Sequence, residues 1–340
     1  MVVCLFMYWT HRSVGFAVDY RRAMTSEPRP TGTVSPFSSP VSPSFAAAVT
    51  TGVPLVLDGG MSNQLGSAGH DLSDELWSAR LLVEQPEAIV DAHLAYYEAG
   101  ADVAITSSYQ ATFEGFAQRG IGRERAAELL GLSVELAREA ARRAKTERPL
   151  WVAASVGPYG AMLADGSEYR GRYGLSVDEL ERFHRPRVEV LAAAGPDVLA
   201  LETVPDVDEA DALLRAVRGL GVPVWLSYSV AGEETRAGQP LTEAFALAGA
   251  ADEVVAVGVN CCAPEDVDRA VELAARVTGK PVVVYPNSGE VWDADARAWS
   301  GSSTFAAGQV TGWRDAGARL IGGCCRVGPQ AITSIADTLR

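Results

Sequence analysis

The sequence predicts a single (β/α)8 barrel, and three observations lead to that prediction. Eight short runs rich in Val, Ile and Leu recur from residue 53 onward without alternation of apolar and polar residues. Such runs are typical of parallel strands that are buried on both faces. Amphipathic stretches separate them in strict order, as in α/β folds. Polar and reactive residues cluster where the runs end, which is where such barrels place their sites.

The eight runs are residues 53–60, 101–109, 150–158, 196–206, 222–229, 254–262, 280–289 and 318–325. A doubly wound open sheet is the alternative. Its usual phosphate fingerprint, G-x-G-x-x-G after the first strand, is missing.

The stretches between the runs have the signals of helices. Residues 84–100 begin near a Pro and end at a Gly. Residues 176–195 begin with a capping-box pattern, Ser176 followed by Glu179, and contain Pro186, which predicts a kink or a break. The remaining predicted helices are residues 122–145, 206–221, 242–250, 264–279, 303–317 and 328–340.

The first part of the chain differs in composition. Residues 25–50 are rich in Ser, Pro and Thr, so we predict a disordered extension over residues 1–50 and the barrel over residues 51–340. The opening residues are apolar but lack a basic n-region and a clean cleavage site, which argues against a secretory signal peptide. Met24 is a candidate for the true start of translation.

Net charge and cysteine usage limit the class of protein. The formal charge of −14 argues against nucleic acid and against an anionic membrane surface as partners. No apolar run reaches 18 residues, so no membrane span is predicted. Five cysteines, four of them in two adjacent pairs, indicate a metal or redox site in a reducing compartment, which predicts a cytoplasmic protein. A disulfide bridge between the two pairs stays open.

The paired cysteines follow the sixth and eighth predicted strands. If the strand ends meet at a barrel mouth, Cys261, Cys324 and Cys325 could supply three thiolates to one tetrahedral Zn²⁺. Gly322 and Gly323 would let the backbone approach the metal or substrate closely. Adjacent strand residues point to opposite faces, so Cys262 is predicted to be a packing residue, with a redox or spare-ligand role as the alternative.

Other polar residues end the predicted strands. Asp58 and Glu202 would place two carboxylates at the mouth, which suits a substrate ammonium group, although Asp58 alone could be a turn former. His93 and His184 lie on predicted helices, as surface or packing residues. The Gly- and Tyr-rich segments 155–163 and 167–174 are typical of a loop over a site, or of a plain surface loop.

Zinc held by three thiolates is a poor Lewis acid for hydrolysis because the centre is negatively charged. It can still bind a thiol as thiolate and lower its pKa below about 8.5. That chemistry suits alkyl transfer to sulfur from a donor with a good leaving group, such as a sulfonium.

Six segments together resemble the homocysteine S-methyltransferase family over roughly residues 53–338: "DGGMSNQL", "TSSYQATFEGF", "SVGPYGAMLADGSEYRGRYG", "LETVPD", "GVNCCAPE" and "GGCCR". The resemblance is closest to the branch that uses S-methylmethionine or S-adenosylmethionine. It implies a (β/α)8 barrel, zinc on Cys261, Cys324 and Cys325, and homocysteine sulfur as the fourth ligand. It also implies that Asp58 and Glu202 bind the amino group of homocysteine. The residues implied to shape the pocket around its carboxylate and thiolate are Gly59, Gly60, Thr106, Ser107 and Asn260. Tyr109 and Asn287 are donor contacts proposed from their positions.

Differences between this sequence and other members of the family bear on the methyl donor and on the oligomeric state. The chain stops soon after its eighth predicted helix and lacks the long C-terminal arm of betaine-using relatives, which favours a monomer over a tetramer and a sulfonium over betaine. The cobalamin and folate modules of the large methionine synthase are missing. A non-catalytic zinc or thiol protein, a thiol–disulfide protein, and a methyltransferase of selenohomocysteine or another thiol or selenol are the alternatives.

Overall fold

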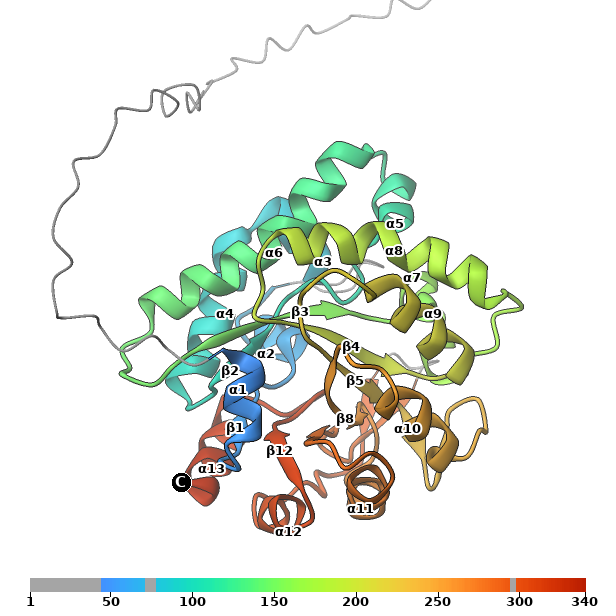
Figure 1. Ribbon diagram of the computed structural model, residues 1–340. Helices are drawn as coiled ribbons and strands as arrows, with labels where there is room; N and C mark the ends of the chain where they lie inside the picture. Colours follow the sequence, from blue (N-terminus) through green and yellow to red (C-terminus); the bar gives the residue numbers. More distant parts are fainter. Residues whose placement is uncertain (1–43, 71–77, 294–297) are drawn as a thin grey trace, which may run out of the picture. The chain divides into compact units, whose positions relative to one another are not determined.

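Eight parallel strands form the main sheet of the computed structural model, and this sheet closes on itself (Figure 1). Its order is β1-β12-β9-β8-β5-β4-β3-β2. The two ends, β1 and β2, are joined by a parallel bridge between Leu57 and Val103. The predicted barrel is confirmed, and the open sheet is wrong. The strands are β1 (Leu55–Val56), β2 (Val103–Ile105), β3 (Trp151–Val156), β4 (Val198–Val204), β5 (Val224–Tyr228), β8 (Val254–Asn260), β9 (Val282–Tyr285) and β12 (Ala318–Ile321).

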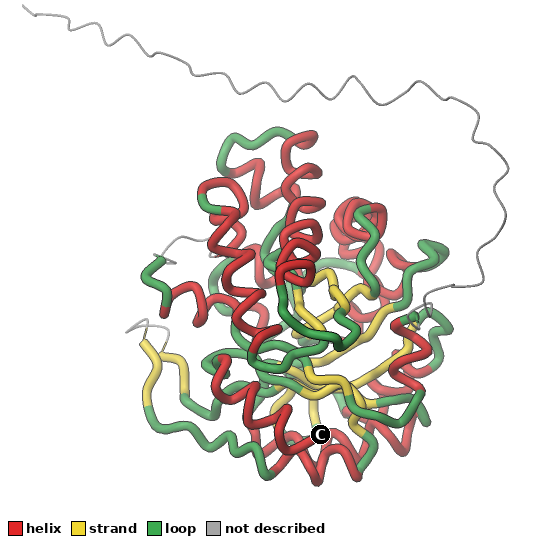
Figure 2. The backbone as a smooth tube through the Cα atoms, turned by 90° about the vertical axis from the view of Figure 1, so that its left-hand side faces the viewer, coloured by secondary structure: helices red, strands yellow, loops and turns green. Residues whose placement is uncertain are grey.

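Helices surround these strands, as Figure 2 shows with the strands in yellow and the helices in red. The helices are α1 (Phe45–Thr50), α2 (Met61–Ser67), α3 (Ser78–Glu84), α4 (Pro86–Glu98), α5 (Phe113–Gln118), α6 (Arg123–Arg143), α7 (Tyr159–Leu163), α8 (Val177–Ala193), α9 (Val207–Val217), α10 (Leu241–Gly249), α11 (Val267–Thr278), α12 (Gln309–Asp315) and α13 (Pro329–Leu339). Two 3₁₀ turns, η1 (Ser167–Tyr169) and η2 (Pro264–Asp266), and two short hairpins, β6 (Val230–Ala231) with β7 (Glu234–Thr235) and β10 (Val291–Asp293) with β11 (Ala298–Ser300), lie in the loops.

The structure describes residues 44–70, 78–293 and 298–340. The prediction of disorder for residues 1–43 lies outside the described residues. Residues 45–50, which the prediction assigned to the same extension, instead form α1, with Phe45, Ala48 and Val49 buried. The predicted boundary at residue 50 is therefore too late, because three apolar side chains at helical spacing outweigh the Ser- and Pro-rich context.

The core has two layers. Alternate strand residues, including Leu57, Trp151 and Trp225, fill the barrel interior, while their neighbours pack outward against the helices. The ring centroid of Phe45 lies 6.3 Å from that of Trp151 and 6.1 Å from that of Trp225. Both tryptophans stand at the starts of their strands, so α1 covers the end of the barrel opposite the strand carboxyl ends.

Local helix signals mostly behave as predicted. The capping box of α8 is present, with Ser176 and Glu179 each bonding the backbone of the other. The helix continues through Pro186, so the predicted break is wrong. Pro186 has no N–H, so α8 lacks one backbone hydrogen bond there. Packing of α8 against α6 and α9 compensates for this loss and keeps the helix continuous.

None of the described helices is both long and apolar enough to cross a membrane.

Candidate metal and substrate site

Three thiols meet at the carboxyl ends of β8 and β12. The Sγ atoms of Cys261, Cys324 and Cys325 all lie within 4.8 Å of one another. The Sγ–Sγ distance between Cys261 and Cys325 is 3.8 Å. Tetrahedral zinc–sulfur bonds of about 2.3 Å would place two sulfurs about 3.8 Å apart. The donor set therefore fits a metal ion that prefers soft ligands.

The backbone conformation at the ends of β8 and β12 directs these three thiols toward one another. Cys261 follows β8 with a φ of 50°, in the left-handed region that side chains rarely adopt. Cys324 and Cys325 lie in a turn beyond the last residue of β12, so the alternation of strand side chains does not separate them. The Cys324 N–H donates to Pro286 O at 2.7 Å, which fixes the turn against the end of β9.

Cys262 points away from this cluster. It is fully buried within the apolar layer between strands and helices, and burial raises the pKa of its thiol. This placement agrees with the predicted packing role. The four described cysteines are free thiols, so the structure contains no bridge between the two pairs.

The three thiols share their protons unequally. Contacts with the Cys324 and Cys325 thiols hold the pKa of Cys261 well below its usual value. The same contacts with Cys261 raise the pKa of Cys324 and of Cys325. Because a metal binds thiolates, a cation at this cluster would release the thiol protons.

Asp58 and Glu202 bring two buried carboxylates to the same mouth. Asp58 accepts a hydrogen bond from the Ile105 N–H at 2.8 Å through Oδ2, while its Oδ1 has no partner among the residues that the structure describes. Burial raises the pKa of Asp58 well above its usual value and that of Glu202 to about 7. Glu202 accepts hydrogen bonds from the hydroxyls of Ser155 and Tyr285. The unpartnered oxygen of Asp58 leaves room for a donor from outside the chain.

The hydroxyl and amide residues predicted to shape the pocket fall into two groups. Ser107 Oγ is buried and has no partner in the described part of the chain, so it can bind a ligand. Thr106 Oγ1 instead accepts from the Ser155 N–H at 3.0 Å. Asn260 Oδ1 accepts from the Thr203 N–H at 2.7 Å, and its Nδ2 donates to Thr203 Oγ1. Thr106 therefore ties the end of β2 to the neighbouring β3, and Asn260 ties the end of β8 to β4, past the intervening β5.

The glycines that follow β1 and β12 allow neighbouring segments of the chain to pack closely against one another. A Cβ on Gly59 would lie 2.1 Å from Val327 O, and one on Gly323 would lie 2.1 Å from Val327 Cγ1. On Gly322 it would meet Leu57 Cβ at 2.6 Å, and on Gly60 Asn63 Oδ1 at 2.6 Å. Gly322 and Gly323 thus admit Leu57, at the end of β1, and Val327 of their own loop. Close approach of their backbone to a metal or substrate stays a prediction.

Tyr109 and Asn287 have different surroundings. The Tyr109 ring packs on Gly157, whose Cβ would lie 2.7 Å from it, and its hydroxyl is hydrogen-bonded to the Thr203 side chain. Asn287 Oδ1 accepts from the Cys325 N–H at 3.1 Å. Asn287 thus holds the turn that carries two of the thiols, and this contact gives no sign of a donor site.

Two site residues escaped sequence reasoning. The Tyr169 hydroxyl lies 3.0 Å from Cys261 Sγ, and Glu168 beside it is buried, with Oε2 unpartnered. Both lie in η1, within a segment that the sequence marked as a loop over the site. The residue types in this segment do not indicate which of its side chains point into the site. His93 and His184 are fully buried packing residues, and His184 Nε2 lies 2.9 Å from Glu209 Oε1.

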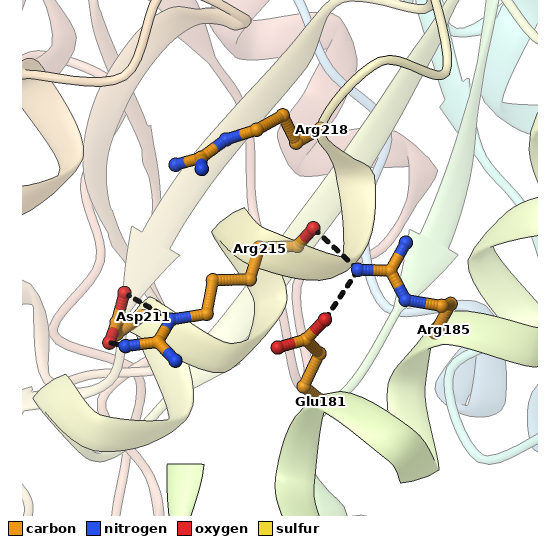
Figure 3. Close-up of a pocket in the computed structure, with 5 residues that line it drawn as sticks. All are labelled: Glu181, Arg185, Asp211, Arg215 and Arg218. Atoms are coloured by element: carbon orange, nitrogen blue, oxygen red, sulfur yellow. Dashed lines mark hydrogen bonds and ion pairs between the residues drawn. The ribbon is translucent and has the colours of Figure 1, made fainter. Parts of the chain in front are cut away.

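A hollow elsewhere on the surface is built from ion pairs. Figure 3 shows it between α8 and α9, where Arg185 pairs with Glu181 and Arg215 with Asp211. It lies in the helix layer and shares no residue with the mouth of the barrel.

The fold and the site define a class: a (β/α)8 barrel with a three-thiol centre, able to hold a metal ion, beside two buried carboxylates. A family sequence profile described as Homocysteine S-methyltransferase matches residues 55–339. The Homocysteine S-methyltransferase of Escherichia coli strain K12 is 47% identical over 290 residues, covering 83% of this chain and 94% of its own. The Selenocysteine Se-methyltransferase of Brassica oleracea var. italica is 43% identical over 307 residues, covering 84% and 88%.

A solved structure agrees with these relatives. The crystal structure of the metallated form of the homocysteine methyltransferase MmuM from Escherichia coli matches with a TM-score of 0.78 and 44% identity. The match covers 86% of this chain and 98% of that one. This chain belongs to the homocysteine S-methyltransferase family, as its sequence motifs predicted.

Proposed function

We propose that this protein is a zinc-dependent homocysteine S-methyltransferase that forms methionine with a methylsulfonium donor, S-methylmethionine or S-adenosylmethionine. The observation that carries the proposal is the meeting of three thiols from β8 and β12 beside the buried Asp58 and Glu202. The metallated relative supports a metal here, and the all-sulfur donor set favours zinc over magnesium or manganese.

Cys261, Cys324 and Cys325 would hold the metal and leave one tetrahedral position for a ligand from outside. Bound zinc would supply an open ligand position that holds the substrate thiol as a nucleophilic thiolate at neutral pH. The turn fixed by Asn287 and the strained backbone of Cys261 keep the three sulfurs in place before substrate arrives.

The carboxylates account for recognition of an amino acid. Asp58 Oδ1 and Ser107 Oγ are buried polar atoms that no described residue partners, and the negative charge of Glu202 helps to raise the pKa of Asp58. A substrate ammonium would satisfy these atoms and offset the cost of burying two acids. Gly59, Gly60, Thr106 and Asn260 would shape this pocket by fixing the strand ends around it.

In the reaction, the homocysteine sulfur attacks the methyl carbon of the donor. The new S–CH₃ bond forms as the bond from carbon to the donor sulfonium breaks. The electron pair of that bond stays on the donor sulfur, which leaves as a neutral thioether. The thiol proton has already been lost, so the transfer needs no general base.

A pair of cysteine variants tests the proposal. Cys324→Ser should lose most bound zinc and most methyl transfer to homocysteine, whereas Cys262→Ala, one residue from Cys261 but outside the cluster, should keep its zinc. X-ray absorption at the zinc edge should show one additional sulfur ligand when homocysteine is added. Full zinc content and full transfer in Cys324→Ser would overturn the proposal, and four protein ligands with no effect of homocysteine would indicate a structural zinc site.

Selenols are a second class of acceptor, because the Brassica oleracea relative is named for selenocysteine. A selenol ionises more readily than a thiol and would use the same open ligand position. Parallel assays with homocysteine, selenohomocysteine and selenocysteine, at fixed donor and zinc, would rank the acceptors.

A further inference from the structure

We propose that Glu168, together with the rings of Tyr109 and Tyr169, binds the cationic sulfonium group of the methyl donor. This inference rests on the proposed function and names residues of this chain that would recognise the second substrate.

Glu168 is a buried acid, and the backbone hydrogen bond that lowers its pKa comes from its own N–H. Its side chain is 6% exposed, and Oε2 has no hydrogen-bond partner among the described residues. The neighbouring charges that act on it, Cys261 and Asp165, are negative as well. Burying an unpaired carboxylate is costly, and an arriving cation would offset that cost. The position therefore favours a cationic ligand.

The carboxylate lies beside the thiol cluster. Glu168 and Tyr169 are neighbours in η1, and the Tyr169 hydroxyl is 3.0 Å from Cys261 Sγ. The charge of Glu168 also raises the pKa of Tyr109 and of Cys325, so its carboxylate is within electrostatic range of both. A cation held here would lie next to the sulfur that accepts the methyl group.

The segment that presents Glu168 is fixed in advance. The Ser167 N–H donates to Asp165 Oδ1 at 2.9 Å, and Arg170 Nη2 donates to Ser167 Oγ at 2.7 Å. Gly160 lets this turn pack closely, since a Cβ there would lie 2.4 Å from the Glu168 nitrogen. The acid is therefore held in place, and it is available to a ligand without rearrangement.

Two substrates with positive charge need two separate acidic positions. Asp58 and Glu202, at the ends of β1 and β4, suit the ammonium of homocysteine, whereas Glu168 comes from the loop after β3. Aromatic faces attract cations, so Tyr109 adds to the attraction of the carboxylate. The guanidinium carbon of Arg236 lies 5.7 Å from the ring centroid of Tyr169, so Tyr169 can add only through its other face. The positive charge on the donor sulfur disappears when the methyl group leaves, so Glu168 binds the donor and releases its neutral thioether product.

The charge on sulfur provides the test. Zinc-loaded protein, with 2-aminobutyrate in excess to occupy the homocysteine position without a thiol, is titrated calorimetrically with S-methylmethionine and with methionine. These ligands share an amino and a carboxylate group and differ in the charge on sulfur. Glu168→Gln should weaken S-methylmethionine binding about tenfold or more and leave methionine binding unchanged, while Glu168→Asp should keep most of the affinity.

Asp178→Asn is the matched control, because it removes the same charge from an exposed side chain on α8. It should change neither affinity. Equal weakening of both ligands by Glu168→Gln, or no weakening of either, would overturn the assignment to the sulfonium. In turnover, Glu168→Gln should raise the KM for the donor and leave the KM for homocysteine unchanged. The titration needs no turnover, so it remains decisive if the wild-type protein transfers no methyl group to homocysteine, the result that would refute the proposed function.

Discussion

Cys261 shows how single residues at the barrel mouth bear strain. Its φ of 50° and that of 58° at Thr203 place two strand-terminal residues in the left-handed region, at a cost of about 1–3 kcal/mol each. The Cys261 N–H donates to Tyr285 O at 3.2 Å, and Asn260 holds Thr203 through two hydrogen bonds. These bonds keep a thiol and the end of β4 turned toward the site, so the backbone supports the chemistry of the side chains.

The pH dependence of homocysteine binding should report Glu202. Burial raises its pKa to about 7, so the carboxyl is charged above pH 7 and neutral below it. Attraction for the substrate ammonium is then present at high pH and lost as pH falls through 7. We expect the KM for homocysteine, measured from pH 5.5 to 8.5, to rise toward acid by up to about tenfold.

Glu202→Gln separates this effect from ionisation of the substrate thiol, which also favours binding at high pH. The variant should have a higher KM at pH 8 and a shallower pH profile. A wild-type profile in Glu202→Gln would show that another group titrates.

At the scale of elements, the loops after β1 and β12 interlock through glycines. The Gly60 N–H donates to Val327 O at 3.0 Å, and the Tyr96 hydroxyl donates to Gly60 O at 3.0 Å. This contact ties the loop of Asp58 to the turn of Cys324 and Cys325. The position of the Asp58 carboxylate and that of the metal ligands are therefore coupled through backbone packing.

Gly59→Ala should disturb this contact. The added Cβ would stand 2.1 Å from a backbone oxygen, which cannot move as a side chain can. We expect a loss of about 1–3 kcal/mol in the free energy of unfolding, together with weaker zinc retention. Chemical denaturation and zinc analysis check both.

Gly131→Ala in α6 is the comparison, because its Cβ would meet nothing within 4 Å and its backbone is helical. It should stabilise the protein by about 0.5–1 kcal/mol. A Gly59→Ala protein as stable as Gly131→Ala would contradict the interlocking of the two loops.

At the scale of the whole molecule, closure of the sheet brings together residues that are far apart in the sequence. The site lies at one end of the barrel, and a helix covers the other end. Strands β8 and β12 are separated by β9 in the sheet, yet their terminal thiols lie within 4.8 Å. At the opposite end α1 covers the barrel with Phe45, which is 2% exposed. The site thus occupies one end of the barrel, and residues that serve stability occupy the other.

Phe45→Ala should lower stability without affecting chemistry. Loss of a buried aromatic ring costs about 3–5 kcal/mol, so we expect Tm to fall by roughly 6 °C or more. Differential scanning calorimetry measures the change, and the KM values for both substrates at 25 °C should stay within twofold of wild type. A large rise in either KM would show that the two ends of the barrel are coupled.

The sequence by itself determined the order of strands and helices, because buried parallel strands and amphipathic helices are local patterns in composition and period. It also identified Cys261, Cys324 and Cys325, since adjacent thiols at strand ends are rare and closure of a barrel brings strand ends together. Only the tertiary structure decided which strand-end residues face a ligand. Asp58 and Ser107 have unpartnered atoms there, while Asn260 and Asn287 bind the protein itself. It also revealed Glu168 and Tyr169, because the direction of a loop side chain depends on packing against segments far away in the chain.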